Sequence, residues 1–240
     1  MWLNLAKVEE HLATRFVGRR VVYLTSTTST MDVARQGAEA GAPDGTVVFA
    51  EEQTKGRGRF DRAWVSPSGK NLYLTLVIRP PLGRLSTGLR PRIKWPNDVL
   101  IDGRKLSGVL IESEISGSAV QYALVGPGIN VNFDIEQSPE IAAIATSIKR
   151  ELGREASREE LLAAFLNHFE ALYEDAPKGD AAFQEWRSRL DTLGREVCVT
   201  FGDQLYEGTA EDVDRDGNLI LVQADGSRRI VEAGEVTLRA

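Results

Sequence analysis

The chain has 240 residues, 42% of them hydrophobic and 27% charged, a composition that predicts a folded globular protein with a sizeable core rather than a disordered chain. Its formal net charge is −6, whereas a general nucleic-acid-binding surface normally carries a basic excess, so we expect no nucleic-acid partner. No stretch approaches the ~18 uninterrupted apolar residues of a membrane span, and the N-terminus has no apolar leader. These features predict a cytoplasmic protein with no membrane partner.

The residues that most often bind metals or form disulfides are scarce. Cys198 is the single cysteine and cannot form an internal disulfide, so we expect it to be buried and structural. His11 and His168 are the only histidines and are far apart in the sequence, without the clustered thiols or carboxylates that a zinc site needs. We therefore predict no metal site made by the protein alone.

The first elements predicted along the chain are a short amphipathic helix over residues 8–16 and a strand over Val21–Leu24. Ser29 and Thr30 then precede a helical pattern, at the position where hydroxyl side chains favour the N-cap. A helix N-terminus also presents hydroxyl and backbone N–H groups to a ligand. The pair thus has either a capping role or a binding role.

An alternation of glycine and arginine, Gly56-Arg57-Gly58-Arg59, follows Gln53 and the apolar strand predicted over Thr46–Ala50. A guanidinium group matches phosphate and carboxylate oxygens in a bidentate manner, and glycine lets the backbone approach a ligand. Trp64 adds a flat aromatic face nearby. The loop predicts an anionic ligand that carries a planar ring, with a solvated turn or an RNA-binding segment as alternatives.

Polar segments also occur at the ends of three later strands. Lys94-Trp95-Pro96-Asn97-Asp98 precedes a predicted hairpin with its turn at Asp102-Gly103, and Lys105 stands before the second strand of that hairpin. Gly126-Pro127-Gly128-Ile129-Asn130 ends a strand that begins near residue 120. Because the strand predicted over Leu72–Ile78 is apolar on both sides, both faces of the sheet should be covered. We expect the polar strand ends to form one pocket, although a Pro-Asn turn alone would account for residues 94–98.

The C-terminal half begins with a helical pattern, introduced by a capping box at residues 157–160 and followed by a second helix over residues 181–190. From Gly194 onward, short strands alternate with turns at residues 216–218 and 225–227, which is typical of a small all-β barrel. We expect an α+β protein with a large domain over residues 1–192, which contains the predicted pocket, and a small β domain over residues 193–240.

Taken in order, these motifs resemble those of the biotin protein ligases. The resemblance extends from about Val22 to the C-terminus and rests on Ser29-Thr30-Met31, Gln53, the loop at residues 56–59, Trp64, KWPND at 94–98, KLSG at 105–108 and the GxGINVN pattern from Gly126. It implies a mixed-sheet catalytic domain followed by an SH3-like barrel. Only about 20 residues precede the first catalytic strand, too few for the helix-turn-helix domain of the bifunctional members, so we expect a ligase-only form.

The resemblance also implies an activity and a set of site residues. Biotin would be activated with ATP, accompanied by Mg²⁺, to biotinyl-5′-AMP and then transferred to a lysine of a biotin carboxyl carrier protein. The implied catalytic residues are Arg57, Arg59, Lys105 and Asp98. Biotin binding is implied for Ser29, Thr30, Met31, Gln53, Arg57, Gly58, Arg59, Lys105 and Gly108. Nucleotide binding is implied for Trp64, Lys94, Asn97 and Asn130.

Two departures from the family pattern stand out. Only residues 82–90 lie between Pro81 and Pro91, where the family carries a long apolar helix, and Pro127 replaces a small residue. The missing helix predicts lower stability and activity, with the uncovered sheet face exposed, closed by a second copy in a homodimer, or filled by rearrangement. A lipoate-type acyl-adenylate ligase, a non-catalytic biotin-binding module and an RNA-binding protein are the alternative functions.

Overall fold

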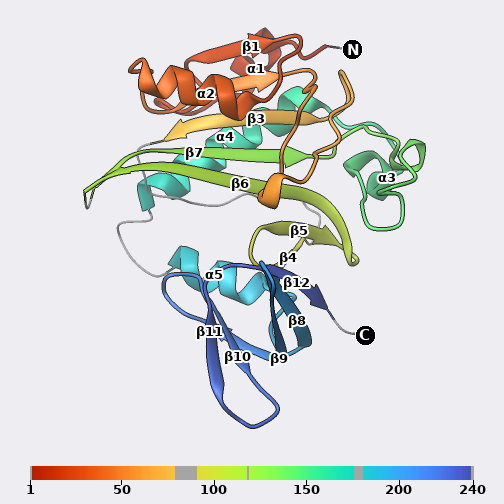
Figure 1. Ribbon diagram of the computed structural model, residues 1–240. Coiled ribbons are helices and arrows are strands. Elements are labelled where there is room, and N and C mark those ends of the chain that lie inside the picture. Colours follow the sequence, from red (N-terminus) through yellow and green to blue (C-terminus); the bar gives the residue numbers. More distant parts are fainter. Residues whose placement is uncertain (1, 79–90, 118, 176–180, 239–240) are drawn as a thin grey trace.

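The computed structural model describes residues 2–78, 91–117, 119–175 and 181–238. Within these residues a seven-stranded mixed sheet lies above a five-stranded antiparallel sheet formed by the C-terminal part of the chain (Figure 1). The predicted α+β class is therefore confirmed. The connection between Pro81 and Pro91, on which the missing-helix argument depends, lies in the gap at residues 79–90, outside the described residues.

The large sheet has the strand order β1-β2-β3-β7-β6-β5-β4. Strands β1 and β2 are parallel, and all other neighbours are antiparallel. The strands are β1 Val21–Leu24, β2 Thr46–Ala50, β3 Leu72–Ile78, β4 Arg92–Lys94, β5 Asp98–Ile101, β6 Arg104–Ser116 and β7 Ala119–Ile129. The predicted strands at 21–24, 46–50 and 72–78 are thus confirmed, whereas β6 and β7 extend further than their apolar patterns indicated.

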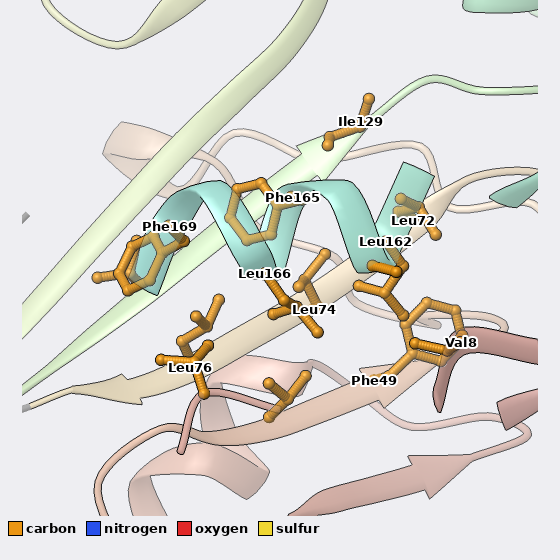
Figure 2. Packing of buried hydrophobic residues seen from close by; sticks show 14 of the residues in the cluster. Val8, Phe49, Leu72, Leu74, Leu76, Ile129, Leu162, Phe165, Leu166 and Phe169 are labelled. Carbon is orange, nitrogen blue, oxygen red and sulfur yellow. The ribbon is translucent and has the colours of Figure 1, made fainter. Parts of the chain in front are cut away.

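One face of this sheet is covered by α1 (Leu5–His11) and α4 (Arg158–Asp175). Alternate residues of β3, Leu72, Leu74 and Leu76, pack against the apolar side of α4, as Figure 2 shows. All three leucines are buried, and burying one such side chain contributes about 1.5–3 kcal/mol. One half of the predicted capping box is present: the Ser157 hydroxyl accepts a hydrogen bond from the Glu160 amide at 3.1 Å.

The opposite face is covered by α2 (Thr30–Glu39), which packs Met31, Ala34 and Ala38 against the sheet. Both faces of β3 are therefore buried, as its apolar sequence predicted. The helix predicted over residues 8–16 is placed differently: α1 begins earlier, because Asn4 caps it by accepting a hydrogen bond from the Ala6 amide at 3.0 Å. It ends at His11, and the Glu170 carboxylate binds the backbone amides of residues 15–17 instead.

The C-terminal sheet has the order β11-β10-β9-β8-β12 and packs beside α5 (Ala181–Arg189). Its strands are β8 Glu196–Phe201, β9 Gln204–Val213, β10 Leu219–Val222, β11 Arg228–Val231 and β12 Glu235–Leu238. Its core also contains Trp95, which comes from the connection between β4 and β5 and is 1% exposed. The Trp95 indole N–H donates to the Gly217 carbonyl at 2.8 Å. This tryptophan therefore fixes the small sheet to the edge of the large one.

Two smaller observations complete the description of the fold. Cys198 lies in β8 and is free and half-buried rather than buried as expected. Among the described residues, none of the helices combines the length and apolar character needed to cross a bilayer. The remaining helical segments are α3 Ile148–Leu152 and the short 3-10 turns η1 Arg59–Asp61 and η2 Ile135–Gln137.

Candidate active site

A cavity of about 550 Å³ opens where the polar strand ends of the large sheet meet β12 of the small one. Every residue to which the sequence gave a site role lines it: Ser29, Thr30, Met31, Gln53, Arg57, Gly58, Arg59, Trp64, Lys94, Asn97, Asp98, Lys105, Gly108 and Asn130. The prediction that these strand ends form one pocket is confirmed. The role of each residue within the pocket stays a prediction.

A chain of hydroxyl and amide groups forms the wall beside α2. The Thr75 hydroxyl donates to Thr30 Oγ1 at 2.9 Å, and the Thr30 hydroxyl donates to Gln53 Oε1 at 3.1 Å. Gln53 Nε2 in turn donates to Ser66 Oγ at 3.3 Å. Ser29 occupies the N-cap of α2, but its hydroxyl makes no capping hydrogen bond, so capping does not explain this residue. Its lining of the cavity leaves it positioned for a ligand.

Arg57 lies at the rim of the cavity in an ion pair with Asp32, a residue of the first turn of α2. Its two terminal nitrogens reach the two carboxylate oxygens at 2.7 and 3.2 Å, which is the bidentate geometry that favours arginine. The hydrogen bond from Arg57 holds the pKa of Asp32 below its usual range, against the opposing effect of burial. Asp32 is therefore an anion that is paired with the segment at residues 56–62, called the ligand loop below.

The other end of the same loop contacts the C-terminal sheet. Arg59 Nη1 donates to the Gly234 carbonyl at 3.1 Å, and Arg62 forms an ion pair with Glu235 of β12. Burial lowers the pKa of the Arg59 guanidinium, and the nearby Asp98 carboxylate partly opposes this shift. Phe60, which lies between Arg59 and Arg62 in the sequence, has a positive φ of 55° and is 52% exposed. The loop is thus held by α2 at Arg57 and by β12 at Arg59 and Arg62.

Three charged residues meet on the floor of the cavity. Lys105 Nζ lies 2.6 Å from Asp98 Oδ1, and Lys94 Nζ lies 4.0 Å from Asp98 Oδ2. Asp98 begins β5 opposite Gly108, whereas Lys105 lies next to the turn, opposite Leu100, so the expectation that the hairpin places both at one end is wrong. The two residues meet because the long Lys105 side chain extends along β6 past Gly108 to Asp98. The arrangement brings two ammonium groups and one carboxylate to a position that an anionic substrate can reach.

The Trp64 ring packs against the backbone of β6 at Gly108 and of β7 at Gly128. A Cβ atom added to Gly128 would come within 2.6 to 2.8 Å of indole atoms of Trp64, so only glycine leaves room for the ring there. The Lys105 ammonium lies 5.4 Å from the ring centre, within range of a cation-π contact. The indole N–H is buried and has no hydrogen-bond partner among the described residues. It is a donor still without an acceptor, beside the cations of the site.

Asn130 is held from two sides. Asn71 Nδ2 donates to Asn130 Oδ1 at 3.2 Å, and Asn130 Nδ2 donates to the Thr146 carbonyl at 3.0 Å. The Asn71 side chain also accepts a hydrogen bond from the Val131 amide at 2.9 Å. These contacts fix the strand end after β7 together with the segment near Thr146, which forms one wall of the cavity.

Sequence reasoning missed several residues of the site. Thr75 is hidden within an apolar strand, and Asp32 looks like an ordinary first-turn acid that favours a helix N-terminus. Residues Ile141, Ala143, Ile144 and Ala145, together with Glu235 of the C-terminal sheet, also line the cavity. No local pattern marks the latter group, because distant parts of the chain bring it to the site.

The donors in the cavity suit a metal ion poorly. Its carboxylates, Asp98 and Glu235, are both paired with cations. Within the described ranges, no three residues of the types His, Cys, Asp and Glu gather into a metal-binding group. The residues therefore do not form a protein cage for Mg²⁺, which commonly binds through substrate phosphates.

Comparison with known proteins agrees with this site. The Biotin/lipoate A/B protein ligase family model matches residues 22–90 and 84–130, and the biotin protein ligase C terminal domain model matches residues 192–239. The chain is 30% identical over 253 residues to the Bifunctional ligase/repressor BirA of Bacillus spizizenii, covering 96% of this chain and 78% of the relative. It is 35% identical over 222 residues to the Biotin--[acetyl-CoA-carboxylase] ligase of Paracoccus denitrificans, covering 79% and 88%.

Among solved structures, the biotin protein ligase from Aquifex aeolicus in complex with biotin and ATP is 27% identical, with a TM-score of 0.73. That similarity covers 92% of this chain and 99% of the Aquifex chain. The ordered motifs, the cavity that collects them and the match of both family models along the chain lead to one conclusion: the chain belongs to the biotin protein ligase family.

Proposed function

We propose that this protein activates biotin with ATP to form biotinyl-5′-AMP and then transfers the biotinyl group to a lysine of a biotin carboxyl carrier protein. The observation that carries the proposal is the convergence of Arg57, Arg59 and Lys105 on one cavity that also contains Trp64 and Asp98. The biotin carboxylate and ATP, a nucleoside triphosphate, are both anions. Their reaction therefore needs cations that are already in place to reduce the repulsion between them.

In the first half-reaction, a carboxylate oxygen of biotin attacks the α-phosphorus of ATP, and the bond to pyrophosphate breaks. Arg57, Arg59 and Lys105 neutralise the two anions as they approach, with Lys105 between the carboxylate and the α-phosphate. Mg²⁺ bound to the triphosphate supplies further charge neutralisation. Because Asp32 holds Arg57 and the Gly234 carbonyl holds Arg59, these two cations need little reorganisation when charge develops in the transition state.

In the second half-reaction, the neutral amine of the carrier lysine attacks the carbonyl carbon of the mixed anhydride, and AMP leaves. Asp98 receives and orients that amine and accepts the proton that the nitrogen loses as the amide forms. The loop at residues 56–59 covers the adenylate in the meantime, because a mixed anhydride is destroyed by water.

The remaining roles are those that the family resemblance implies, and all of these residues line the cavity. Ser29, Thr30 and Gln53 bind the ureido ring of biotin, with Met31, Gly58 and Gly108 around it. The nucleotide is bound by Trp64, Lys94, Asn97 and Asn130. We also propose the division into a catalytic domain over residues 1–192 and an SH3-like domain over residues 193–240, with Trp95 linking the two.

The cellular context belongs to the same proposal. Biotin-dependent carboxylases supply the carrier domain, the reaction takes place in the cytoplasm, and neither nucleic acid nor a membrane takes part. We also propose that the protein forms a homodimer. It is supported by exposed apolar residues on β6 and β7: Ile111 is 51%, Ile115 60% and Val120 45% exposed.

The decisive experiment follows labelled biotin onto a purified carrier domain, with and without ATP. Stable labelling that requires ATP and is lost when the carrier lysine is replaced by arginine supports the proposal. A parallel reaction with lipoate separates a lipoate-type ligase from a biotin ligase. Biotin binding without pyrophosphate release would instead indicate a non-catalytic binding module.

A further inference from the structure

Asp32 is the one acid on α2 whose contact reaches the ligand loop directly, among the residues that the structure describes. Its carboxylate binds Arg57 through both terminal guanidinium nitrogens, at 2.7 and 3.2 Å. The Thr28 hydroxyl also donates to Asp32 Oδ2 at 3.3 Å, which adds a third hydrogen bond to the same carboxylate. Asp32 directly follows Thr30 and Met31, which line the cavity, so one helical turn links the polar wall of the site with the arginine above it.

The local sequence makes such an anchor important. Arg57 lies between Gly56 and Gly58, and glycine leaves a loop more backbone freedom to lose than any other residue. The arginine side chain adds its own rotamer freedom. A fixed counter-ion restricts both the backbone of the loop and the rotamers of the arginine. Less conformational entropy is then lost when the guanidinium group binds an anionic substrate, which favours binding. The outer N–H groups of a guanidinium in a bidentate pair can still donate to a second anion.

We propose that Asp32 is a positioning residue for the ligase reaction: it holds Arg57 at the rim of the cavity before biotin binds, and so sets the affinity for biotin and the retention of the adenylate. The inference rests on the proposed function of Arg57. Asp32 does not touch the reacting atoms, and it acts through the arginine.

The same helix offers a matched control. Arg35, one turn further along α2, forms an ion pair with Glu112 of β6 that makes no contact with the ligand loop. The side chains of this pair are 39% and 26% exposed, and those of the Arg57–Asp32 pair are 32% and 36% exposed. Glu112→Gln therefore removes a pair of similar exposure from α2 without freeing Arg57.

The test compares Asp32→Asn with Glu112→Gln in the full chain. Asp32→Asn should raise the KM for biotin about five- to tenfold, the scale of one net hydrogen bond in a partly exposed pair. It should also increase the fraction of biotinyl-AMP released to solvent, whereas Glu112→Gln should match the wild type in both. A loss of folded protein would instead lower the maximal rate and leave KM unchanged. Asp32→Glu should recover part of the affinity.

A double-mutant cycle shows whether Asp32 acts through Arg57. In an Arg57→Ala background, Asp32→Asn should cause no further rise in the biotin KM. A rise by the same factor as in the wild type would overturn the proposal, as would a biotin KM in Asp32→Asn equal to that of Glu112→Gln.

A readout without substrates separates this proposal from the proposed function. Trypsin cleaves after arginine, and the ligand loop contains Arg57, Arg59 and Arg62. Asp32→Asn should speed tryptic cleavage of the ligand-free loop several-fold relative to Glu112→Gln. Equal cleavage rates would overturn the anchoring role. If the wild type forms no adenylate, the proposed function fails, and the proteolysis result still decides whether Asp32 orders the loop.

Discussion

The ammonium nitrogen of Lys105 lies 2.6 Å from a carboxylate oxygen of Asp98, so the cation proposed for the first half-reaction is paired with the acid proposed for the second. Lys94 approaches the other oxygen of the same carboxylate at 4.0 Å. Substrate anions must therefore compete with Asp98 for Lys105. Once Lys105 has turned to the adenylate, Asp98 becomes available to the incoming amine, which gives the two steps a natural order.

Replacement of Lys105 by Gln removes the charge and keeps most of the length and the polar end of the side chain. We expect adenylate formation to fall about 10²- to 10³-fold, the scale for one preorganised group that stabilises a transition state. Biotin binding should weaken much less, because the interaction is strongest in the transition state. Pyrophosphate release and equilibrium biotin binding measure the two quantities, and an equal loss in both would assign Lys105 to ground-state binding.

Asp98→Asn tests the other member of the pair with a side chain of nearly the same shape. Adenylate formation should be largely retained, whereas transfer from preformed biotinyl-AMP to the carrier should slow about 10²- to 10⁴-fold, the usual contribution of a general acid or base. Single-turnover reactions started with the isolated adenylate measure the second step alone. Normal transfer combined with slow adenylation would reverse the proposed roles of Lys105 and Asp98.

Local sequence could predict the pocket because each of its motifs stands at the end of a strand. The strand at Thr46–Ala50 is mostly apolar and fully buried, and it leaves the polar residues that follow it at the edge of the sheet. Once the strands are placed, Gln53 and Asn130 have few other positions open to them. The helix α1 was misplaced because its cap, Asn4, precedes the apolar pattern on which the prediction relied.

Contacts between distant segments were beyond sequence reasoning. Trp95 belongs to a motif of the catalytic site, yet its side chain lies in the core of the C-terminal sheet and donates to Gly217. Asp32 pairs with Arg57, and Glu235 pairs with Arg62, through charges whose sequence context fits solvated surfaces equally well. Such pairings depend on how whole elements pack against one another, and the residue pattern within one element does not predict that packing.

Gly128→Ala tests the packing of Trp64. The new Cβ would come within 2.6 to 2.8 Å of the indole, so the ring must move away from the strand. We expect the KM for ATP to rise about tenfold or more, because base stacking on an aromatic ring contributes about 1–3 kcal/mol. Gly37→Ala is the control, since its Cβ would meet only Ala42 at 3.7 Å. Unchanged ATP kinetics in Gly128→Ala would exclude Trp64 from the nucleotide site.

Glu51→Gln tests a buried ion pair beneath the site. Glu51 is 0% exposed and receives hydrogen bonds from Arg158 at 2.8 Å, the Tyr23 hydroxyl at 2.6 Å and the Leu3 amide at 2.5 Å. Removing its charge leaves Arg158 buried without its carboxylate partner, which should cost about 3–5 kcal/mol in the free energy of unfolding. Urea denaturation at pH 7 measures this loss, and Glu211→Gln, in the exposed pair with Arg228, should change stability little.

The same carboxylate predicts a pH dependence. Burial alone would raise the pKa of Glu51, but the hydrogen bonds from Arg158, Tyr23 and Leu3 outweigh it, and the pKa lies below the ordinary 4.5. A depressed carboxyl pKa contributes stability above the unfolded value, and that contribution is lost as the pH falls through the folded value. The stability difference between wild type and Glu51→Gln should therefore shrink as the pH falls below about 4.5. A difference independent of pH would show that the charge of Glu51 does not carry the effect.

The exposed apolar residues on β6 and β7 test the consequence of the short connection between Pro81 and Pro91. Ile111 and Ile115 lie four residues apart on one strand and so point to the same face, and Ile115 is paired with Val120 across the ladder. Soluble monomers rarely leave apolar patches larger than a few hundred Å² uncovered. The chain should therefore associate through this face or bind a hydrophobic dye, and the double variant Ile111→Thr, Ile115→Thr should reduce whichever of the two is observed.

An amphipathic helix inserted between Ser86 and Gly88 should raise the Tm by covering the same face. Light scattering, dye fluorescence and thermal melts measure these effects. If the chain is monomeric, binds no dye and gains no stability from the insertion, the face is covered by other means and the argument from the short connection is wrong.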